Sequence, residues 1–173
     1  MKKTIQVLNR LRSRGLVQDY AIGGAIAAMR YLEPSVTDDL DVYIHLSPGS
    51  GSIVTLTPIY DHLKVLGYPE FKREGILIGK WPVQFLPVSS PLEEEAFQQA
   101  VEDKIEGEPV RVFRAEHLMT LCLNLGRQKD RARLAQFLEE GAYDAKKLME
   151  ILCCHGLQAK WKNFVLLMQK DAR

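Results

Sequence analysis

The sequence of 173 residues predicts an α+β fold, with a small mixed sheet flanked by helices and then a C-terminal helical bundle. Up to residue 114, short apolar runs typical of strands alternate with segments of helical periodicity. From Ala115 onward, apolar residues recur only at spacings of three and four, which is typical of helices. We therefore expect a sheet domain over residues 1–114 and a helical region over residues 115–173.

Composition agrees with a globular protein and excludes several other classes. Hydrophobic residues make up 46% of the chain, and 23 basic residues nearly balance 22 acidic residues. This balance provides no overall attraction to nucleic acid, so any such binding would need a local basic patch. No run approaches the roughly 18 apolar residues that a membrane span requires, so we expect no membrane association and a cytoplasmic location. Three cysteines, two of them adjacent, form no plausible disulfide framework.

The first predicted element is an amphipathic helix from Thr4 to Arg14. Ile5, Leu8 and Leu11 fall on one side of it, and Gly15 ends it. We expect this helix to pack on the first strand. Binding at a membrane surface is the alternative interpretation of a basic amphipathic helix.

A diglycine turn, Gly23-Gly24, follows the short apolar strand that ends with Ile22. After the turn, an alanine-rich segment predicts a helix to about Leu32, and Pro34 ends it. Free backbone N–H groups at the start of a helix attract phosphate, and glycine lets a ligand approach the backbone closely. Taken alone, a diglycine turn is equally compatible with a simple packing role.

The next segment alternates between apolar and polar residues, which predicts a strand from Asp39 to Ile44. One face would carry Leu40, Val42 and Ile44, and the other Asp39, Asp41 and Tyr43. Side chains at positions i and i+2 originate about 7 Å apart on the same face, so two carboxylates there can converge on hard cations. Mg²⁺ prefers such oxygen ligands and shares them with substrate phosphates. Asp39 and Asp41 are therefore candidate ligands of Mg²⁺, although a solvent-facing strand explains either residue alone.

Together, the diglycine turn, the helix and the segment Thr37-Asp38-Asp39-Leu40-Asp41 resemble the signature of the DNA polymerase beta type nucleotidyltransferase superfamily. The match covers about Tyr20 to Ile44. It is most similar to small stand-alone bacterial members, which include toxins of abortive-infection systems and enzymes that nucleotidylate small molecules or RNA. A weaker similarity lies in Leu118 to Leu138, where Asn124 to Arg131 resembles a Gly-Arg-x-Lys-Asp segment of the helical tail.

The resemblance implies that residues 1–114 form a nucleotidyltransferase domain that binds a nucleoside triphosphate such as ATP. It would transfer the nucleoside monophosphate to an acceptor hydroxyl on RNA, on a protein or on a small molecule. Asp39 and Asp41 would hold Mg²⁺ and act in catalysis. Gly23 and Gly24 would seat the phosphates, and Thr37 would orient the first aspartate.

The densest basic cluster, Arg127, Lys129, Arg131 and Arg133, lies in the second region of similarity. Arginine and lysine side chains suit phosphate oxygens, so Arg127 and Lys129 are candidate substrate ligands if the tail folds over the site. A charged helix face with partners one turn away is the alternative.

Two positions depart from the family pattern. Many active members carry a third carboxylate on the following strand, where this chain has Gln84. An amide can position an acceptor hydroxyl but cannot deprotonate it. Glu74 would substitute if the sheet brings it near Asp41, and a solvated charge at the end of a strand is the alternative. Related sequences also often carry a lysine where this chain has Cys122.

These two departures favour a second hypothesis. The chain would then be a catalytically degenerate module that binds a nucleotide or a protein partner, for instance within a toxin–antitoxin or regulatory pair. The adjacent Cys153, Cys154 and His155 lack the spacing of a zinc site.

The remaining elements follow from local signals. Ser47 to Ser52 has the composition of a mobile loop, either a lid or a connector. Between it and residue 114 we predict a helix over Pro58–Leu66, strands over Glu74–Gly79 and Pro82–Pro87, a helix over Ser90–Val101 and a hairpin over Lys104–Phe113 that turns at Gly107-Glu108-Pro109. The tail would consist of helices over Ala115–Leu125, Asp130–Glu139, Tyr143–Cys154 and Leu157–Lys170.

Overall fold

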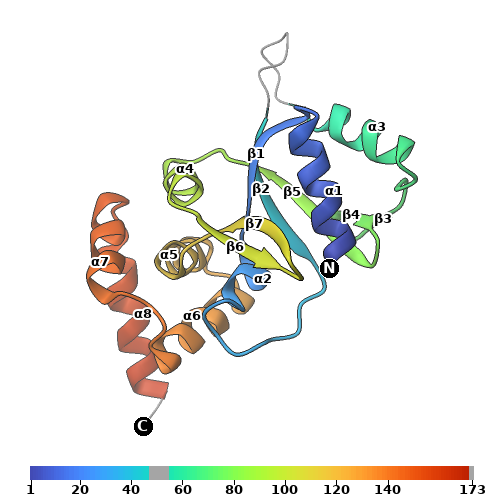
Figure 1. The fold of residues 1–173 in the computed structure, drawn as a ribbon. Coiled ribbons are helices and arrows are strands. Elements are labelled where there is room, and N and C mark those ends of the chain that lie inside the picture. Colours follow the sequence, from blue (N-terminus) through green and yellow to red (C-terminus); the bar gives the residue numbers. More distant parts are fainter. Residues whose placement is uncertain (47–54, 172–173) are drawn as a thin grey trace.

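A computed structural model describes residues 1–46 and 55–171, and Figure 1 shows that this part of the chain is a mixed sheet with helices around it. The described helices are α1 (Lys2–Ser13), α2 (Gly24–Ala28), α3 (Thr57–Val65), α4 (Pro91–Gln98), α5 (Ala115–Leu125), α6 (Gln128–Glu140), α7 (Ala145–Cys154) and α8 (Gln158–Asp171). The described strands are β1 (Val17–Ile22), β2 (Leu40–Leu46), β3 (Phe71–Lys72), β4 (Gly75–Ile78), β5 (Trp81–Pro87), β6 (Val101–Ile105) and β7 (Glu108–Val112). The predicted α+β class is confirmed.

The strands form one sheet in the order β3-β4-β5-β2-β1-β7-β6. Pairing is parallel between β2 and β5 and between β1 and β7, and the remaining neighbours are antiparallel. The sheet is therefore mixed, as predicted. This order places β2 at the centre, where Asp41 pairs in register with Gln84 of β5.

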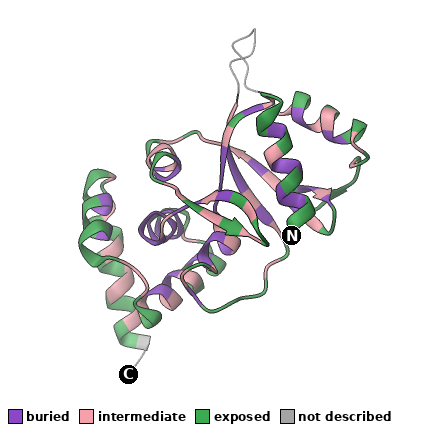
Figure 2. Ribbon diagram, in the orientation of Figure 1, coloured by how far each residue is buried: buried purple, intermediate pink, exposed green. Residues whose placement is uncertain are grey.

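The apolar face predicted for the first helix is a face that the fold buries (Figure 2). In α1, Ile5, Leu8 and Leu11 are buried, and the helix contacts β1, β4 and β7, as expected for packing on the sheet. Its Thr4 also donates a hydrogen bond of 3.0 Å from Oγ1 to the carbonyl oxygen of Ile78. Burial of this stripe accounts for the amphipathic pattern without a membrane surface.

Several boundaries differ from prediction for local reasons. The helix α2 ends at Ala28 rather than Leu32, because the chain continues in tight turns such as Tyr31 N–H to Ala28 C=O (2.9 Å). Likewise, α4 ends at Gln98 because Val101 already belongs to β6.

The turn between β6 and β7 also lies one residue earlier than predicted. Ile105 pairs with Glu108, so the turn consists of Glu106 and Gly107, both with positive φ. Pro109 belongs to β7, opposite Lys104. The strand β3 was not predicted, because two residues carry no detectable periodicity.

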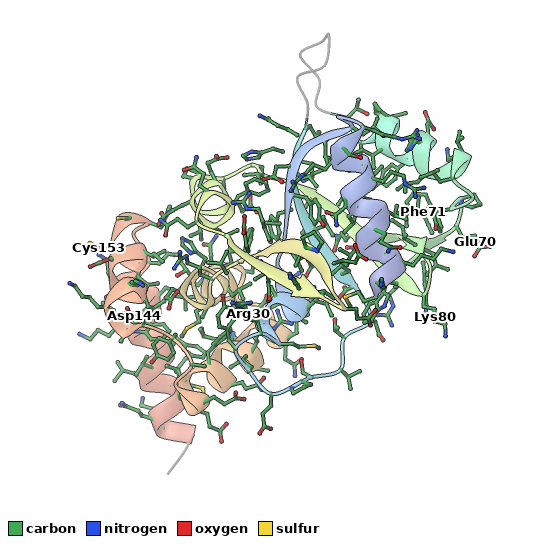
Figure 3. All side chains as sticks on the ribbon, in the orientation of Figure 1. Arg30, Glu70, Phe71, Lys80, Asp144 and Cys153 are labelled. Carbon is green, nitrogen blue, oxygen red and sulfur yellow. The ribbon has the colours of Figure 1, made fainter. Side chains whose placement is uncertain are left out.

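From Ala115 the described chain is helical, and its buried side chains join those of the sheet in one continuous core. Asp144, labelled in Figure 3, lies at the start of α7. It caps this helix by accepting hydrogen bonds from the backbone N–H groups of Lys146 (3.0 Å) and Lys147 (3.1 Å). Cys153 and Cys154 are exposed on this helix. The loop predicted between Leu46 and Thr57 lies mostly outside the described residues. Within residues 1–46 and 55–171, no helix combines the length and apolar character needed to cross a membrane.

Candidate functional site

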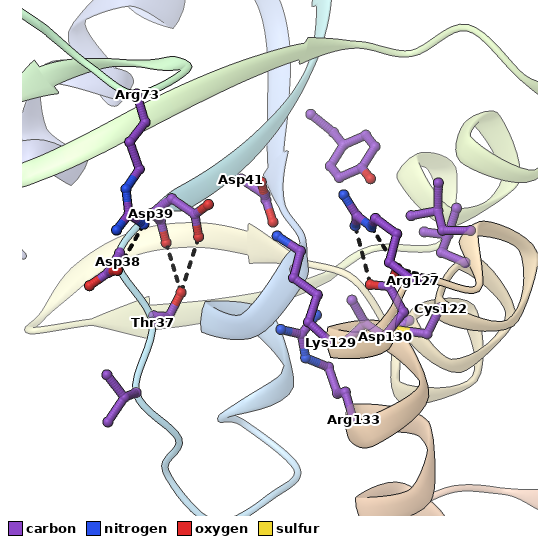
Figure 4. Close-up of a pocket in the computed structure, with 16 residues that line it drawn as sticks. Thr37, Asp38, Asp39, Asp41, Arg73, Cys122, Arg127, Lys129, Asp130 and Arg133 are labelled. Carbon is purple, nitrogen blue, oxygen red and sulfur yellow. Dashed lines mark hydrogen bonds and ion pairs between the residues drawn. The ribbon is translucent and has the colours of Figure 1, made fainter.

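A pocket of about 240 Å³ lies where the segment before β2 meets α5 and α6 (Figure 4). It combines charged side chains of both signs with an apolar wall. The lining residues are Gly24, Val36, Thr37, Asp38, Asp39, Asp41, Tyr43, Arg73, Leu118, Leu121, Cys122, Leu125, Arg127, Lys129, Asp130 and Arg133.

The diglycine turn lies directly against the first residues of β2. The backbone N–H of Gly23 donates to the carbonyl oxygen of Asp41 (3.0 Å). Gly24 has a φ of +57°, and a Cβ at this position would collide with the carboxylate of Asp41. At Gly23 a Cβ would lie 2.5 Å from Cε2 of Tyr43. Only glycine therefore lets the backbone at position 24 lie beside this carboxylate.

Asp39 and Asp41 both face the pocket, although β2 begins one residue after Asp39. Burial raises the pKa of Asp41, and the negative charge of Asp39 raises it further. The hydroxyl of Thr37 donates to Oδ1 of Asp39 (3.1 Å), which fixes the first carboxylate. The two carboxylates are thus close enough to repel each other, a situation that a bound cation relieves.

Three basic side chains reach the pocket from the helical part of the chain. Arg127 precedes α6, and its guanidinium donates two hydrogen bonds to the buried carboxylate of Asp130, from Nε (2.7 Å) and Nη2 (3.2 Å). Lys129 and Arg133 lie one turn apart on α6, and Figure 4 shows Lys129 extending toward Asp41. Their positive charges lower the pKa of Asp41 and partly offset burial. Arg131 instead lines a separate groove between α6 and α8.

Gln84 stands where related proteins carry a third carboxylate, and Glu74 is its candidate substitute. Neither residue is part of the pocket lining. Gln84 is the register partner of Asp41, and its Nε2 donates to Oε2 of Glu74 (3.1 Å). Arg73 reaches the pocket rim, where its Nη1 lies 2.8 Å from Oδ2 of Asp38. The turn between β3 and β4 therefore contacts the site region through both of its residues, Arg73 through Asp38 and Glu74 through Gln84.

No known family model matches the sequence, and no characterised protein sequence matches it. Solved structures do match. The solution structure of the antibiotic-resistance factor ANT(2'')-Ia has a TM-score of 0.52 and 18% identity, and the alignment covers 99% of this chain and 97% of that chain. The chain has a nucleotidyltransferase fold.

Two further structures with a nucleotidyltransferase fold align equally well. The crystal structure of ANT(2'')-Ia in complex with adenylyl-2''-tobramycin gives a TM-score of 0.52 at 17% identity, and the alignment covers 90% of this chain and 94% of that chain. An antigenic nucleotidyltransferase-like protein from Paracoccidioides brasiliensis gives 0.52 at 17%, with 92% and 91% covered. At such low identity the similarity establishes the fold alone, and the chemistry has to be argued from the residues of this chain.

The apolar wall of the pocket was not predicted from the sequence. Leu118 and Leu121 of α5 line it, and so does Leu125, which is 53% exposed. Their spacing of three and four residues predicts a helix but does not show that one of its faces lines a pocket. Cys122 lies on the same wall, and burial raises the pKa of its thiol to about 11, so this side chain is neutral at pH 7.

The donor set in the pocket is compatible with one hard divalent cation or two. In the part of the chain that the structure describes, no cluster of three or more histidine, cysteine or acidic side chains is arranged to hold a metal. The two carboxylates of Asp39 and Asp41 would therefore supply only part of a coordination shell. Mg²⁺ commonly completes its shell with water and substrate phosphates, so such a partial set fits this ion.

Proposed function

We propose that this protein binds a nucleoside triphosphate together with Mg²⁺ and transfers the nucleoside monophosphate to an acceptor hydroxyl. The observation that supports the proposal is the single pocket in which Asp39 and Asp41 face a row of basic side chains across Gly24. A triphosphate needs cations around its oxygens, and its metal needs carboxylates. This pocket offers both within about 240 Å³. We also propose that the chain belongs to the DNA polymerase beta type superfamily.

In this proposal Asp39 and Asp41 hold Mg²⁺. The bound metal would neutralise charge on the phosphates and make the acceptor hydroxyl more acidic. Thr37 keeps Asp39 in place through the hydroxyl hydrogen bond of 3.1 Å. Gly24 places bare backbone at the pocket, where phosphate oxygens would approach it. Gly23, whose N–H donates to the carbonyl oxygen of Asp41 (3.0 Å), would hold the turn in place.

The basic side chains would bind the triphosphate. Lys129 and Arg133 project from one face of α6 toward the aspartates, and Arg127 is held in place by its ion pair with Asp130. Catalysis of phosphoryl transfer depends mainly on positioning and on neutralising charge in the transition state. Arg127 and Lys129 contribute through both effects.

The acceptor is proposed to be RNA, a protein or a small molecule with a free hydroxyl. One structural neighbour was solved with adenylyl-2''-tobramycin, an adenylylated antibiotic. ATP as donor and a polyhydroxylated small molecule as acceptor are therefore the first pair to assay.

A second candidate function is a nucleotide-binding or protein-binding module without catalysis. Gln84 favours this function, because it occupies the register position beside Asp41 and its amide cannot accept a proton there. Cys122 in the pocket wall also favours this function, because its neutral thiol provides no charge that would bind a phosphate. Such a module would act through a protein partner, as in a toxin–antitoxin pair.

The two candidates differ in turnover. The wild-type protein would be incubated with each α-labelled nucleoside triphosphate, Mg²⁺ and candidate acceptors, and pyrophosphate release and labelled product would be measured. We expect Asp41→Asn to reduce both at least 100-fold, because the amide removes one negative metal ligand. Asp61→Asn, which changes an exposed aspartate on α3, is the matched control and should keep wild-type turnover.

Wild-type turnover in the double variant Asp39→Asn/Asp41→Asn would reject the assignment of the site. A Mg²⁺-dependent thermal shift with nucleotide but without pyrophosphate release would support the binding module instead.

A further inference from the structure

Transfer to a hydroxyl requires a group that accepts the hydroxyl proton, and the carboxylates lining the pocket are already engaged. Asp39 and Asp41 are the proposed metal ligands. Asp130 is 1% exposed and accepts three hydrogen bonds from Arg127. Asp38 forms an ion pair with Arg73. A base would therefore come from outside this lining, at a position close to it and exposed to solvent.

Glu74 meets this requirement through the geometry of the sheet. In the parallel pair β2–β5, Asp41 and Gln84 are register partners, so their side chains leave the same face one strand spacing apart, about 4.8 Å. The amide Nε2 of Gln84 then donates to Oε2 of Glu74 at 3.1 Å. Glu74 is thus held on the Asp41 face of the sheet, one side chain beyond Gln84.

The backbone around Glu74 is fixed on both sides. Arg73 adopts a left-handed conformation with a φ of +58°, and its ion pair with Asp38 ties the turn to the segment before β2. Gly75 packs so closely on β5 that a Cβ there would lie 2.9 Å from the backbone carbon of Pro82. A residue between two such anchors has little freedom to leave the site. Glu74 itself is exposed, so a proton that it accepts can pass to water.

We propose that Glu74 is the general base of the transfer and that Gln84 is its positioning residue. The inference rests on the proposed function. The acceptor O–H bond breaks and its proton passes to the carboxylate of Glu74, while the acceptor oxygen forms a bond to the α-phosphorus. The bond from the α-phosphorus to the oxygen that bridges to the β-phosphate breaks, and pyrophosphate leaves with that electron pair. Glu74 then returns its proton to solvent.

The decisive experiment exchanges the two side chains. Glu74→Gln removes the base, and general-base contributions are typically worth about 10²- to 10⁴-fold. We expect pyrophosphate release from Mg²⁺-ATP, with water or an acceptor, to fall at least 100-fold in kcat. The Kd for ATP, measured by equilibrium binding, should change less than threefold, because Glu74 does not contact the nucleotide.

The double variant Glu74→Gln/Gln84→Glu keeps one amide and one carboxylate in contact but moves the carboxylate to the strand position beside Asp41. We expect it to recover kcat to within about tenfold of the wild type. Because the exchange also preserves the hydrogen bond, the pH dependence of kcat is measured as well: the acidic limb is expected in the wild type and in the exchanged variant but not in Glu74→Gln, and a purely structural role would leave the pH profile of all three the same. Gln84→Ala, which leaves Glu74 in place but unanchored, should reduce kcat by an intermediate factor. The matched control is Glu70→Gln, which changes another exposed glutamate, directly before β3 (Figure 3), and should match the wild type.

The outcomes separate this inference from the function on which it rests. Wild-type turnover in Glu74→Gln, together with lost turnover in Asp41→Asn, overturns the role of Glu74 and leaves the transferase intact. ATP binding without any pyrophosphate release from the wild-type protein also overturns it, and supports the binding module. Absence of ATP binding overturns the proposed function itself.

Discussion

Replacing Gly24 with alanine should disrupt the centre of the pocket, and the structure gives the size of the effect. A residue with a side chain pays about 1–2 kcal/mol in the left-handed region, where Gly24 lies at a φ of +57°. The new Cβ would also collide with the carboxylate of Asp41, and overpacking of this kind typically costs 1–3 kcal/mol. We therefore expect the free energy of unfolding to fall by about 2–5 kcal/mol relative to the wild type.

Gly141→Ala is the matched control for this change. Gly141 has a similar φ of +65°, but a Cβ there would meet nothing within 4 Å. We expect a loss of only about 1–2 kcal/mol, measured by urea denaturation, and unchanged nucleotide binding. Folded Gly24→Ala protein should bind Mg²⁺-ATP at least tenfold more weakly, because the carboxylate of Asp41 has been displaced.

A double-mutant cycle isolates the contact between the two residues. In an Asp41→Ala background the carboxylate is absent, so Gly24→Ala should cost little more than Gly141→Ala. The reasoning is refuted if Gly24→Ala and Gly141→Ala are equally destabilising in the wild-type background. It is also refuted if Gly24→Ala binds Mg²⁺-ATP with wild-type affinity.

Two further predictions concern charge. Lys129→Gln should weaken ATP binding about tenfold in equilibrium titrations, with a smaller effect at high salt because screening weakens attraction. Burial lowers the pKa of His117, whose Nε2 lies 3.3 Å from Glu95, so acid favours the unfolded state, which binds the proton more tightly. The free energy of unfolding should therefore fall from pH 7 to pH 5.5, and less steeply in His117→Leu, as measured by urea denaturation.

Each of these predictions has a control or a contrary result. Arg131→Gln removes a neighbouring charge that faces the other groove, and it should leave ATP affinity unchanged. Equal losses of affinity in Lys129→Gln and Arg131→Gln would mean that the pocket is not the binding site. A pH slope in His117→Leu as steep as in the wild type would show that other groups control acid sensitivity.

The sequence was sufficient to predict the strand that carries Asp41, although Asp39 lies just before it, because a period of two identifies a buried face without knowledge of its partner. Leu40, Val42 and Ile44 are each at most 1% exposed, as their alternation predicted. The contact between Gly24 and Asp41 could not be predicted in the same way. It depends on the antiparallel register of β1 and β2, which pairs Ile22 with Val42 and is a property of the sheet.

The basic cluster was less predictable, because its orientation depends on where α6 begins and on what the helix packs against. Lys129 and Arg133 are four residues apart and share a face, whereas Arg131 is two residues from each and points elsewhere. Nothing local indicates which face of α6 turns toward the pocket. The hydrogen bond between Gln84 and Glu74 could not be predicted from the sequence either, because it depends on the two-residue strand β3 and on the turn at Arg73.

The balance of charge in the pocket supports the proposal that a metal and a nucleotide bind together rather than separately. Arg127 is paired with Asp130, and Arg73 with Asp38, which leaves Asp39 and Asp41 opposite Lys129 and Arg133. A divalent cation bound alone would be repelled by the two basic side chains, and a triphosphate bound alone by the two carboxylates. If both bound together, the aspartates would be available to hold the metal and the basic side chains to contact phosphate oxygens. Because the carboxylates come from the sheet and the basic side chains from α6, this complementarity exists only while the helical region is packed on the sheet.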